Sequence, residues 1–287
     1  MNKNIEELMK LFDNELQELK KPLYRDLEEL IRPLSMDSIH LVKTQRSVFT
    51  KIGGQPFANK NFKWPKWNNQ SLAFIMQIKL SEITLLSQIK LFPQEGLLYI
   101  FYDKKQSTWG FDPKDKGSWK IIFEREHDNL ITIPYPTDLE NDYRYEEKRL
   151  IQKIIKTYPS WEDEMIKSKN LTDEQEDLYM DFTSSVYCCE PEHQIAGIAC
   201  AIQSPDMELE CQLVSNGLYL GDSSVYDDPR SKELEKNKSD WILLLQIGTD
   251  DDVDMMWGDG GMLYFWIKKD DLAKLNFEDT WMILQCG

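Results

Sequence analysis

The same local pattern occurs twice in this sequence: an apolar segment that ends near a Gln, a loop, a Gly and an aromatic segment. The first copy comprises residues 74–78 (FIMQI) and 96–101 (GLLYIF), and the second comprises residues 243–247 (LLLQI) and 261–266 (GMLYFW). Short apolar runs rich in aromatic residues predict buried β-strands. The pattern therefore predicts an internal duplication, and a chance similarity between buried strands is the alternative.

A weaker match extends the repeat upstream, where residues 52–56 (IGGQP) align with residues 195–199 (IAGIA). Glycines at this place favour a tight turn before each apolar strand. The chain ends on one more aromatic and apolar run at 281–286 (WMILQC), which predicts a further strand.

Helices are predicted before and between the two copies. Residues 4–19 carry apolar side chains at steps of three and four, and residues 22–31 form a second amphipathic segment between two prolines. Apolar residues within 142–156 also recur at helical spacing. Thr172 and Gln175 have the spacing of a capping box, which predicts a helix that runs to residue 182.

Together these segments predict an α+β fold, internally duplicated, with mostly antiparallel strands covered by N-terminal and central helices. An N-terminal helical segment (1–35) precedes one duplicated domain (36–287). Within that domain we expect a first repeat at about 46–137, connecting helices at about 138–183 and a second repeat at about 184–287. The chain has 287 residues, enough to bury roughly 75% of its unfolded surface. No linker rich in Gly, Ser or Pro divides it, so we expect one compact unit.

The formal net charge is −16 and the pI is about 4.7. Such a field repels phosphate backbones and anionic lipids, which argues against nucleic acid or a membrane surface as a partner. Residues 138–192 hold fifteen acidic residues against seven lysines or arginines. Such a run is typical of a solvated face, and a docking surface for a basic protein is the alternative.

The five cysteines have no framework spacing, which favours reduced thiols and a cytoplasmic protein. The N-terminal residues are charged throughout, unlike a secretory signal. The apolar runs are far shorter than the ~20 residues that cross a bilayer. We therefore expect a cytoplasmic, bacterial-type protein, and the sequence leaves its oligomeric state open.

Motifs with a known reaction mechanism are absent from the sequence. Asp250, Asp252 and Asp254 match the first ligand positions of an EF-hand, but the Gly and Glu that such a loop needs later do not follow. His193 lies beside two cysteines and two glutamates without the paired spacing of a zinc site. We expect no cofactor and assign no metal site. Whether His193 binds a metal with Glu190 and Glu192, or the aspartates at 250–254 do, stays open.

The candidate binding site is the corner of Trp257, Gly258, Asp259 and Gly260. Glycines on both sides of Asp259 allow positive φ, so its carboxylate can stand at the start of a rigid strand beside the Trp257 ring. We expect this corner to form a groove with the strand-end amides and a Trp on the rim: Gln77, Gln246 and Trp64. The alternatives are that Asp259 only caps the turn and that the glutamines only tie strands together.

In combination, these motifs resemble the YwqG-like family of bacterial proteins, a domain of unknown function. The resemblance covers about residues 46–286, through IGGQP, the Trp-Pro at 64–65, both strand-to-Gln motifs and the Trp-Gly-Asp corner. Ala199 departs from it, because the second copy commonly has Pro there. The resemblance implies a duplicated α+β fold and brings no agreed activity or catalytic residue. Relatives are associated with toxin-immunity proteins, which is an analogy.

Two classes of function remain. The leading one is a non-enzymatic binding protein, of the immunity kind, that binds a basic protein partner. The alternative is an enzyme or sensor that acts on a small polar molecule near the Trp-Gly-Asp corner, which the nine Trp, twelve Tyr and twelve Phe would favour.

Overall fold

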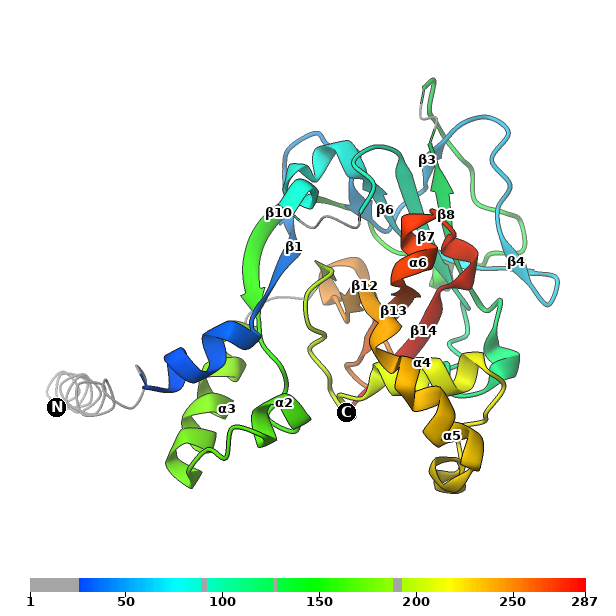
Figure 1. Cartoon of the computed structure of the whole chain (residues 1–287). Coiled ribbons are helices and arrows are strands. Elements are labelled where there is room, and N and C mark those ends of the chain that lie inside the picture. The colour runs from blue at the N-terminus through cyan, green and yellow to red at the C-terminus, as the bar shows by residue number, and fades with distance from the viewer. Residues whose placement is uncertain (1–25, 89–91, 126–127, 188–192) are drawn as a thin grey trace, which may run out of the picture.

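We analysed a computed structural model, which describes residues 26–88, 92–125, 128–187 and 193–287 (Figure 1). Its main element is a ten-stranded antiparallel sheet. The strands of the sheet are β1 (Met36–Thr44), β2 (Lys51–Ile52), β6 (Ala73–Lys79), β7 (Leu97–Tyr102), β8 (Trp119–Glu124), β10 (Lys148–Thr157), β11 (Gln194–Ile195), β12 (Trp241–Gly248), β13 (Met262–Lys268) and β14 (Trp281–Gln285). Two small ladders join β3 (Phe57–Ala58) to β9 (Ile131–Thr132), and β4 (Lys66–Trp67) to β5 (Gln70–Ser71).

The sheet has the strand order β14-β13-β12-β11-β1-β10-β2-β6-β7-β8. The two long strands β1 and β10 pair at its centre, from Met36↔Thr157 to Thr44↔Arg149. On the outer sides, β1 pairs with β11, which follows β10 in the chain, and β10 pairs with β2, which follows β1.

The two edge strands of the sheet, β8 and β14, contact each other through side chains. Trp119 Nε1 donates a hydrogen bond to the carbonyl oxygen of Thr280 at 3.3 Å, and the ring centroids of Trp119 and Trp281 lie 5.1 Å apart. Lys120 of β8 also pairs with Glu278. The sheet is thus curled until its edges meet, which gives it a shape close to a barrel.

The strands predicted from continuous apolar runs all form. β6, β7, β12 and β13 are buried along almost their whole length, and β14 is buried throughout. Side chains on one face of these strands belong to the main core, and Phe74, Leu97, Tyr99 and Phe101 belong to a second, smaller cluster. Burial on both faces of a strand explains why these runs are continuous and do not alternate with polar residues.

The expected helix within residues 142–156 is wrong, because strand β10 occupies 148–157. Its apolar residues have helical spacing, but the segment pairs with β1 along nine residue pairs. Strand β1 lies more than a hundred residues earlier in the chain, and its pairing overrides the local preference. Most side chains of β10 are only partly buried, so its sequence lacks the continuous apolar run of the other strands.

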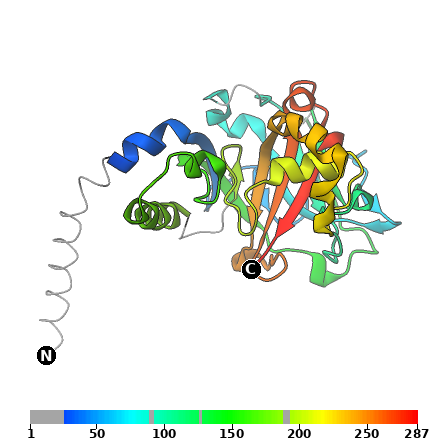
Figure 2. The same ribbon diagram turned by 60° about the horizontal axis from the view of Figure 1, so that its bottom comes forward.

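The N-terminal and central helices pack on one another at one side of the sheet (Figure 2). Residues 26–31 are helical, and α2 (Glu164–Lys167) and α3 (Asp173–Tyr187) share a small core with them, formed by Leu27, Ile31, Ile166, Leu178 and Tyr179. The capping box of α3 is present, since Gln175 N donates to Thr172 Oγ1 at 3.3 Å and Thr172 N to Gln175 Oε1 at 3.0 Å. The predicted helix at 4–19 lies outside the described residues.

Another helix, α4 (Met207–Ser215), packs against β12 and β14. The sequence pattern does not predict this helix. The remaining α-helices are α5 (Pro229–Leu234) and α6 (Lys269–Ala273). Short 3₁₀ helices connect the elements: η1 (Arg32–Leu34), η2 (Leu80–Glu82), η3 (Thr84–Gln88), η4 (Pro113–Asp115), η5 (Asn141–Tyr143), η6 (Ser223–Asp227), η7 (Glu235–Asp240), η8 (Asp251–Val253) and η9 (Phe277–Asp279).

Candidate functional site

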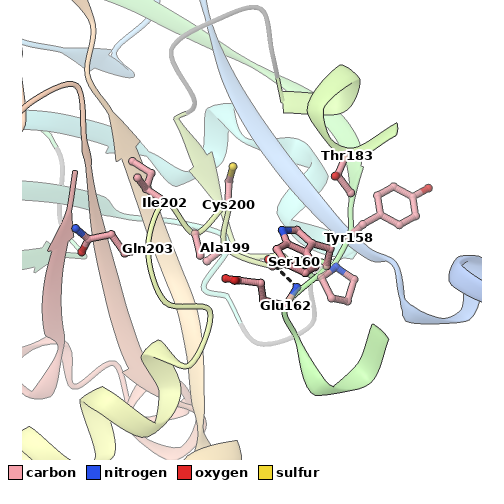
Figure 3. A pocket seen from close by; sticks show the side chains of 11 residues that line it. Tyr158, Ser160, Glu162, Thr183, Ala199, Cys200, Ile202 and Gln203 are labelled. Carbon is pink, nitrogen blue, oxygen red and sulfur yellow. Dashed lines mark hydrogen bonds between the residues drawn. The ribbon is translucent and has the colours of Figure 1, made fainter. Parts of the chain in front are cut away.

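A cleft of about 440 Å³ opens between the helical cluster and the second half of the sheet (Figure 3). One wall is the segment 158–162, which follows β10, together with Thr183 of α3. The other wall is the segment 199–203, which follows β11. The lining residues are Tyr158, Pro159, Ser160, Trp161, Glu162, Thr183, Ala199, Cys200, Ala201, Ile202 and Gln203.

The helical cluster holds the first wall in place. Tyr179 OH donates to the carbonyl oxygen of Pro159 at 2.7 Å, and the backbone N–H of Glu162 donates to Ser160 Oγ at 3.3 Å. The ring of Tyr158 packs edge-on against Phe182 with centroids 4.8 Å apart. Trp161 lies in the same segment, lines the cleft and is 45% exposed. The wall therefore offers an aromatic face and a carboxylate on a fixed backbone.

Glutamine and tyrosine side chains from the sheet hold the second wall. The backbone N–H of Cys200 donates to Gln246 Oε1 at 2.9 Å, and Tyr264 OH donates to the carbonyl oxygen of Cys200 at 2.6 Å. The backbone N–H groups of Ile202 and Gln203 both donate to Gln285 Oε1 at 3.0 Å. Within the part of the chain that the structure describes, the segment is thus held by side chains and pairs with no strand.

A left-handed turn leads the chain into this wall. Ala196 and Gly197 have φ values of +56° and +80°. A Cβ on Gly197 would lie 2.6 Å from Ser38 Cβ and 2.7 Å from Thr157 Oγ1. Thr157 Oγ1 also accepts the backbone N–H of Ile198 at 2.9 Å. Glycine at 197 is therefore required both by its conformation and by the close approach of the two central strands.

The first half of the chain holds Phe57 in the same way. Its backbone N–H donates to Gln77 Oε1 at 2.8 Å, and Tyr99 OH donates to its carbonyl oxygen at 2.9 Å. Here, however, a strand lies across the segment: β9 pairs with β3, and the N–H of Ile133 donates to the carbonyl oxygen of Pro56 at 2.9 Å. The two halves thus share one arrangement, but their outer partners differ.

Four carboxylates, Asp163, Asp206, Glu208 and Glu210, belong to the segments that follow the two walls in the chain. Burial, and then the nearby charges of Asp163 and Asp206, raise the pKa of Glu208 to about 7. Burial also raises the pKa of Glu210 to about 7, with further contributions from Asp206 and Glu208. Asp163 and Asp206 add negative charge at this end of the cleft, which favours a cation, whereas Glu208 and Glu210 are partly protonated near pH 7.

The structure buries the Trp257 side chain completely. Its Nε1 donates to the carbonyl oxygen of Gly248 at 3.1 Å, and its ring contacts Tyr102 and Tyr145 with centroids 6.1 and 5.9 Å away. The ring therefore presents no face to solvent, contrary to the expected geometry. Tyr102, from the first half, and Tyr145, from the segment between the halves, cover it, which the local sequence could not reveal.

The rest of the Trp-Gly-Asp corner lies at the surface. Gly258 and Gly260 have the expected positive φ values, +56° and +72°, and Asp259 is exposed. Gln106, from the other half of the chain, accepts the N–H of Gly258 at 3.0 Å and donates to the carbonyl oxygen of Met256 at 2.7 Å. A ligand role for Asp259 stays a prediction.

The expected groove would also need Gln77, Gln246 and Trp64. Both glutamines are buried and bonded to backbone, on strands with four others between them in the sheet. Trp64 packs on Phe101 in the first half and donates to the carbonyl oxygen of Leu72 at 2.8 Å. The structure does not gather these side chains around Trp257. Of the predicted residues, Gln246 is the one that supports a wall of the cleft.

A buried polar network surrounds one of the aspartates considered for a metal. Asp250 accepts from Lys43 Nζ at 2.7 Å and lies 3.2 Å from His193 Nε2. Burial lowers the pKa of His193. Burial alone would raise the pKa of Asp250, but the hydrogen bonds and charges of His193 and Lys43 outweigh that effect and hold its pKa below the usual range. Within the residues that the structure describes, no three His, Cys, Asp or Glu side chains group as metal ligands. Glu190 and Glu192 lie outside those residues.

The sequence does not predict Trp161 and Glu162 as site residues, because nothing in their local sequence differs from a charged surface turn. The usable signal is the alignment of residues 195–199 with residues 52–56, which places Cys200 opposite Phe57. Gln203 and Gln285 end apolar runs like the other glutamines: Gln285 accepts the backbone N–H of Gln203, and the Gln203 side chain donates to the carbonyl oxygen of Cys286.

Comparisons with known proteins give a family but no activity. A search among functionally curated proteins gave no significant match. No helix in the described part of the chain has the length and apolar character needed to cross a membrane. Residues 50–286 match a protein family described as a domain of unknown function, DUF1963. Since this match covers most of the chain, the protein belongs to the DUF1963 family.

Proposed function

We propose that this protein is a binding protein without enzymatic activity, and that its cleft takes in an extended, basic segment of a partner protein. The observation that carries the proposal is the second wall. It is a piece of backbone held in place by Gln246, Tyr264 and Gln285 while its outer side lines a cleft of about 440 Å³. A rigid, open backbone beside an aromatic side chain suits a peptide better than a compact metabolite.

Charge supports the choice of a basic segment. Glu162 lines the cleft, and Asp163 and Asp206 continue its walls in a chain of net charge −16. The exposed ring of Trp161 can bind the cationic group of Lys or Arg over its face. The negative field would also increase the association rate of a basic partner.

A display experiment with the full chain tests this function. Random octapeptides on phage, selected against the immobilised protein, should enrich Lys or Arg, and the selected peptides should bind in calorimetry. Trp161→Ala should weaken binding about tenfold, as loss of an aromatic anchor does. Trp109→Ala is the matched control, because Trp109 is 39% exposed and lies outside the cleft.

Glu162→Gln separates charge from shape. We expect about threefold weaker binding at low salt and a smaller difference at about 0.5 M salt, where screening is strong. Glu95→Gln, at an exposed site elsewhere, should have no effect. Failure to select any octapeptide, or equal effects of the Trp161 and Trp109 variants, would contradict the proposed function.

We also infer that the chain is an internal duplication of about 36–124 and 148–285, and that within its family it is YwqG-like. Three parallels support the duplication. If β1 is matched with β10, β2 with β11, β6 with β12, β7 with β13 and β8 with β14, the strand order reads the same from both edges of the sheet. Register shifts occur at Phe74/Met76 and Leu243/Leu245. Lys51 and Gln194 each donate to the carbonyl oxygen four residues later.

An experimental structure tests the duplication by superposition of these two ranges. Gln77 should fall on Gln246, Gly96 on Gly261 and Phe57 on Cys200. Unrelated positions for these pairs would overturn it. A cytoplasmic location and a toxin as the basic partner stay predictions that rest on the sequence and the resemblance.

A further inference from the structure

We propose that the partner's segment binds as an added β-strand, antiparallel to residues 199–201, and pairs its backbone with Ala199 and Ala201. This inference rests on the proposed function and states its binding mode and ligand class: an extended polypeptide recognised mainly through its main chain. The specific observation is that the first half of the same molecule already contains such a strand at the matching place.

In the first half, backbone directions alternate along the segment 56–58. The N–H and carbonyl groups of Phe57 point to Gln77 and Tyr99. The residues on either side, Pro56 and Ala58, face the other way and pair with β9, through Ile133 N to Pro56 O at 2.9 Å and the register Ala58↔Ile131. Glutamine and tyrosine therefore satisfy the inner side of the segment, and a strand satisfies the outer side.

In the second half, the inner side is satisfied in the same way. The N–H and carbonyl groups of Cys200 bond to Gln246 and Tyr264. Backbone groups of successive residues in an extended chain point to opposite sides. Ala199 and Ala201 must therefore direct their N–H and carbonyl groups outward, and both residues line the cleft.

No strand covers this outer side within the described residues. Neither Ala199 nor Ala201 has a hydrogen-bond partner among residues 26–88, 92–125, 128–187 and 193–287. A row of unpaired backbone groups is a template for one more strand. The added strand would occupy the cleft of about 440 Å³ that Ala199 and Ala201 line.

The opposite wall indicates the side chains that would fit. Alternate residues of an added strand point to the same side, so one set faces the Trp161 ring and the Glu162 carboxylate. A Lys or Arg there gains both a cation–π contact and an ion pair. The added strand thus supplies affinity through its backbone and specificity through a basic residue.

Amide hydrogen exchange tests the pairing directly. The probe is the tightest octapeptide from the display experiment, bound to the ¹⁵N-labelled full chain. We expect the exchange of the Ala201 amide to slow about tenfold or more on binding, whereas the Cys200 amide, already bonded to Gln246, should change little. Unchanged exchange at both Ala199 and Ala201 would overturn strand addition.

Backbone changes in peptide and protein give a second test. N-methylation along the peptide should weaken binding about tenfold at every second amide, because only alternate N–H groups face the edge. Ala201→Pro should cause a similar loss. Ala199→Pro, which copies Pro56 of the first half, should cost less than about threefold, and unfolding temperatures identify any variant that fails to fold.

The outcomes separate the two proposals. If no octapeptide binds the wild-type chain, the proposed function fails. If a peptide binds and Trp161→Ala weakens it, but N-methylation has the same effect at every amide, the function stands and strand addition is wrong.

Discussion

The backbone N–H of Cys200 donates a hydrogen bond of 2.9 Å to the fully buried side chain of Gln246. This bond joins strand β12 to a segment that pairs with no strand in the described part of the chain. The matching bond in the first half joins Phe57 to Gln77 at 2.8 Å. At both places, the oxygen of a glutamine side chain accepts the backbone hydrogen bond that a neighbouring strand would otherwise accept, and it holds the adjoining segment in position.

Replacement of Gln246 by Leu keeps a similar volume but removes the side-chain oxygen that accepts the Cys200 N–H. We expect a loss of about 1–3 kcal/mol in the free energy of unfolding, measured by urea denaturation. Gln77→Leu is the matched control and should cost about the same. Peptide affinity distinguishes the two, because only Gln246→Leu displaces the wall of the cleft. Equal peptide affinities in the two variants would count against this wall as the binding surface.

Stability should fall in mild acid because of His193. Burial lowers the pKa of this imidazole in the folded state, so the unfolded chain takes up a proton first. The contribution of neutral His193 is therefore complete above about pH 6.5 and is lost as the pH falls below that value. His193→Gln should reduce the difference in unfolding free energy between about pH 7.5 and pH 5.

His40 is the control for this measurement. Burial lowers its pKa as well, but it bonds to Gln194 and not to Asp250. His40→Gln should remove only its own part of the pH dependence. If His193→Gln leaves the wild-type difference unchanged, the buried pair with Asp250 does not control acid stability.

Glu210 should act in the opposite direction. Its side chain is 6% exposed, Oε2 has no hydrogen-bond partner in the described part of the chain, and burial raises its pKa from 4.5 to about 7. Below pH 4.5 both states are protonated, and as the pH rises through 7 the folded state must hold a buried charge. Glu210→Gln should therefore stabilise the protein by about 1–3 kcal/mol at pH 8.

This gain should disappear below about pH 4.5, which chemical denaturation at several pH values can follow. The exposed Glu95 provides the comparison, since Glu95→Gln should change stability little at any pH. A gain of equal size at acid and alkaline pH would mean that packing, and not charge, explains the variant.

The sequence predicts those parts of the fold whose signal is local. Strands β6, β7, β12, β13 and β14 are buried on both faces, so their apolar runs are continuous and unmistakable. The central pair β1 and β10 escaped prediction, because both strands are partly exposed and each is defined by its pairing with the other.

The candidate site, like the central strand pair, depends on contacts between segments that lie far apart in the chain. The strand-end glutamines were recognised as buried amides, but the backbone groups that they bind, at Phe57 and Cys200, belong to segments without periodicity. Trp257 is predicted to offer a flat face beside Asp259, and it is buried because Tyr102 and Tyr145 cover it. Contacts between distant segments decide both cases, and a single sequence does not encode them as a local pattern.

Gly197, at the entrance to the second wall, and Gly217, after α4, separate conformational strain from steric conflict. Gly197 and Gly217 have similar φ values, +80° and +89°. A Cβ at 217 would meet nothing within 4 Å, whereas one at 197 would lie 2.6 Å from Ser38 Cβ. Gly217→Ala should therefore cost only about 1 kcal/mol, the strain of a left-handed alanine.

Gly197→Ala should cost clearly more, about 3 kcal/mol or above, because the added methyl group also forces apart the two central strands. It should weaken peptide binding as well, since the turn positions residues 199–203. Thermal unfolding of the two variants and of the wild type, followed by peptide titration, measures both effects. Equal destabilisation of the two variants would show that the approach of Ser38 and Thr157 to this turn is not close in solution.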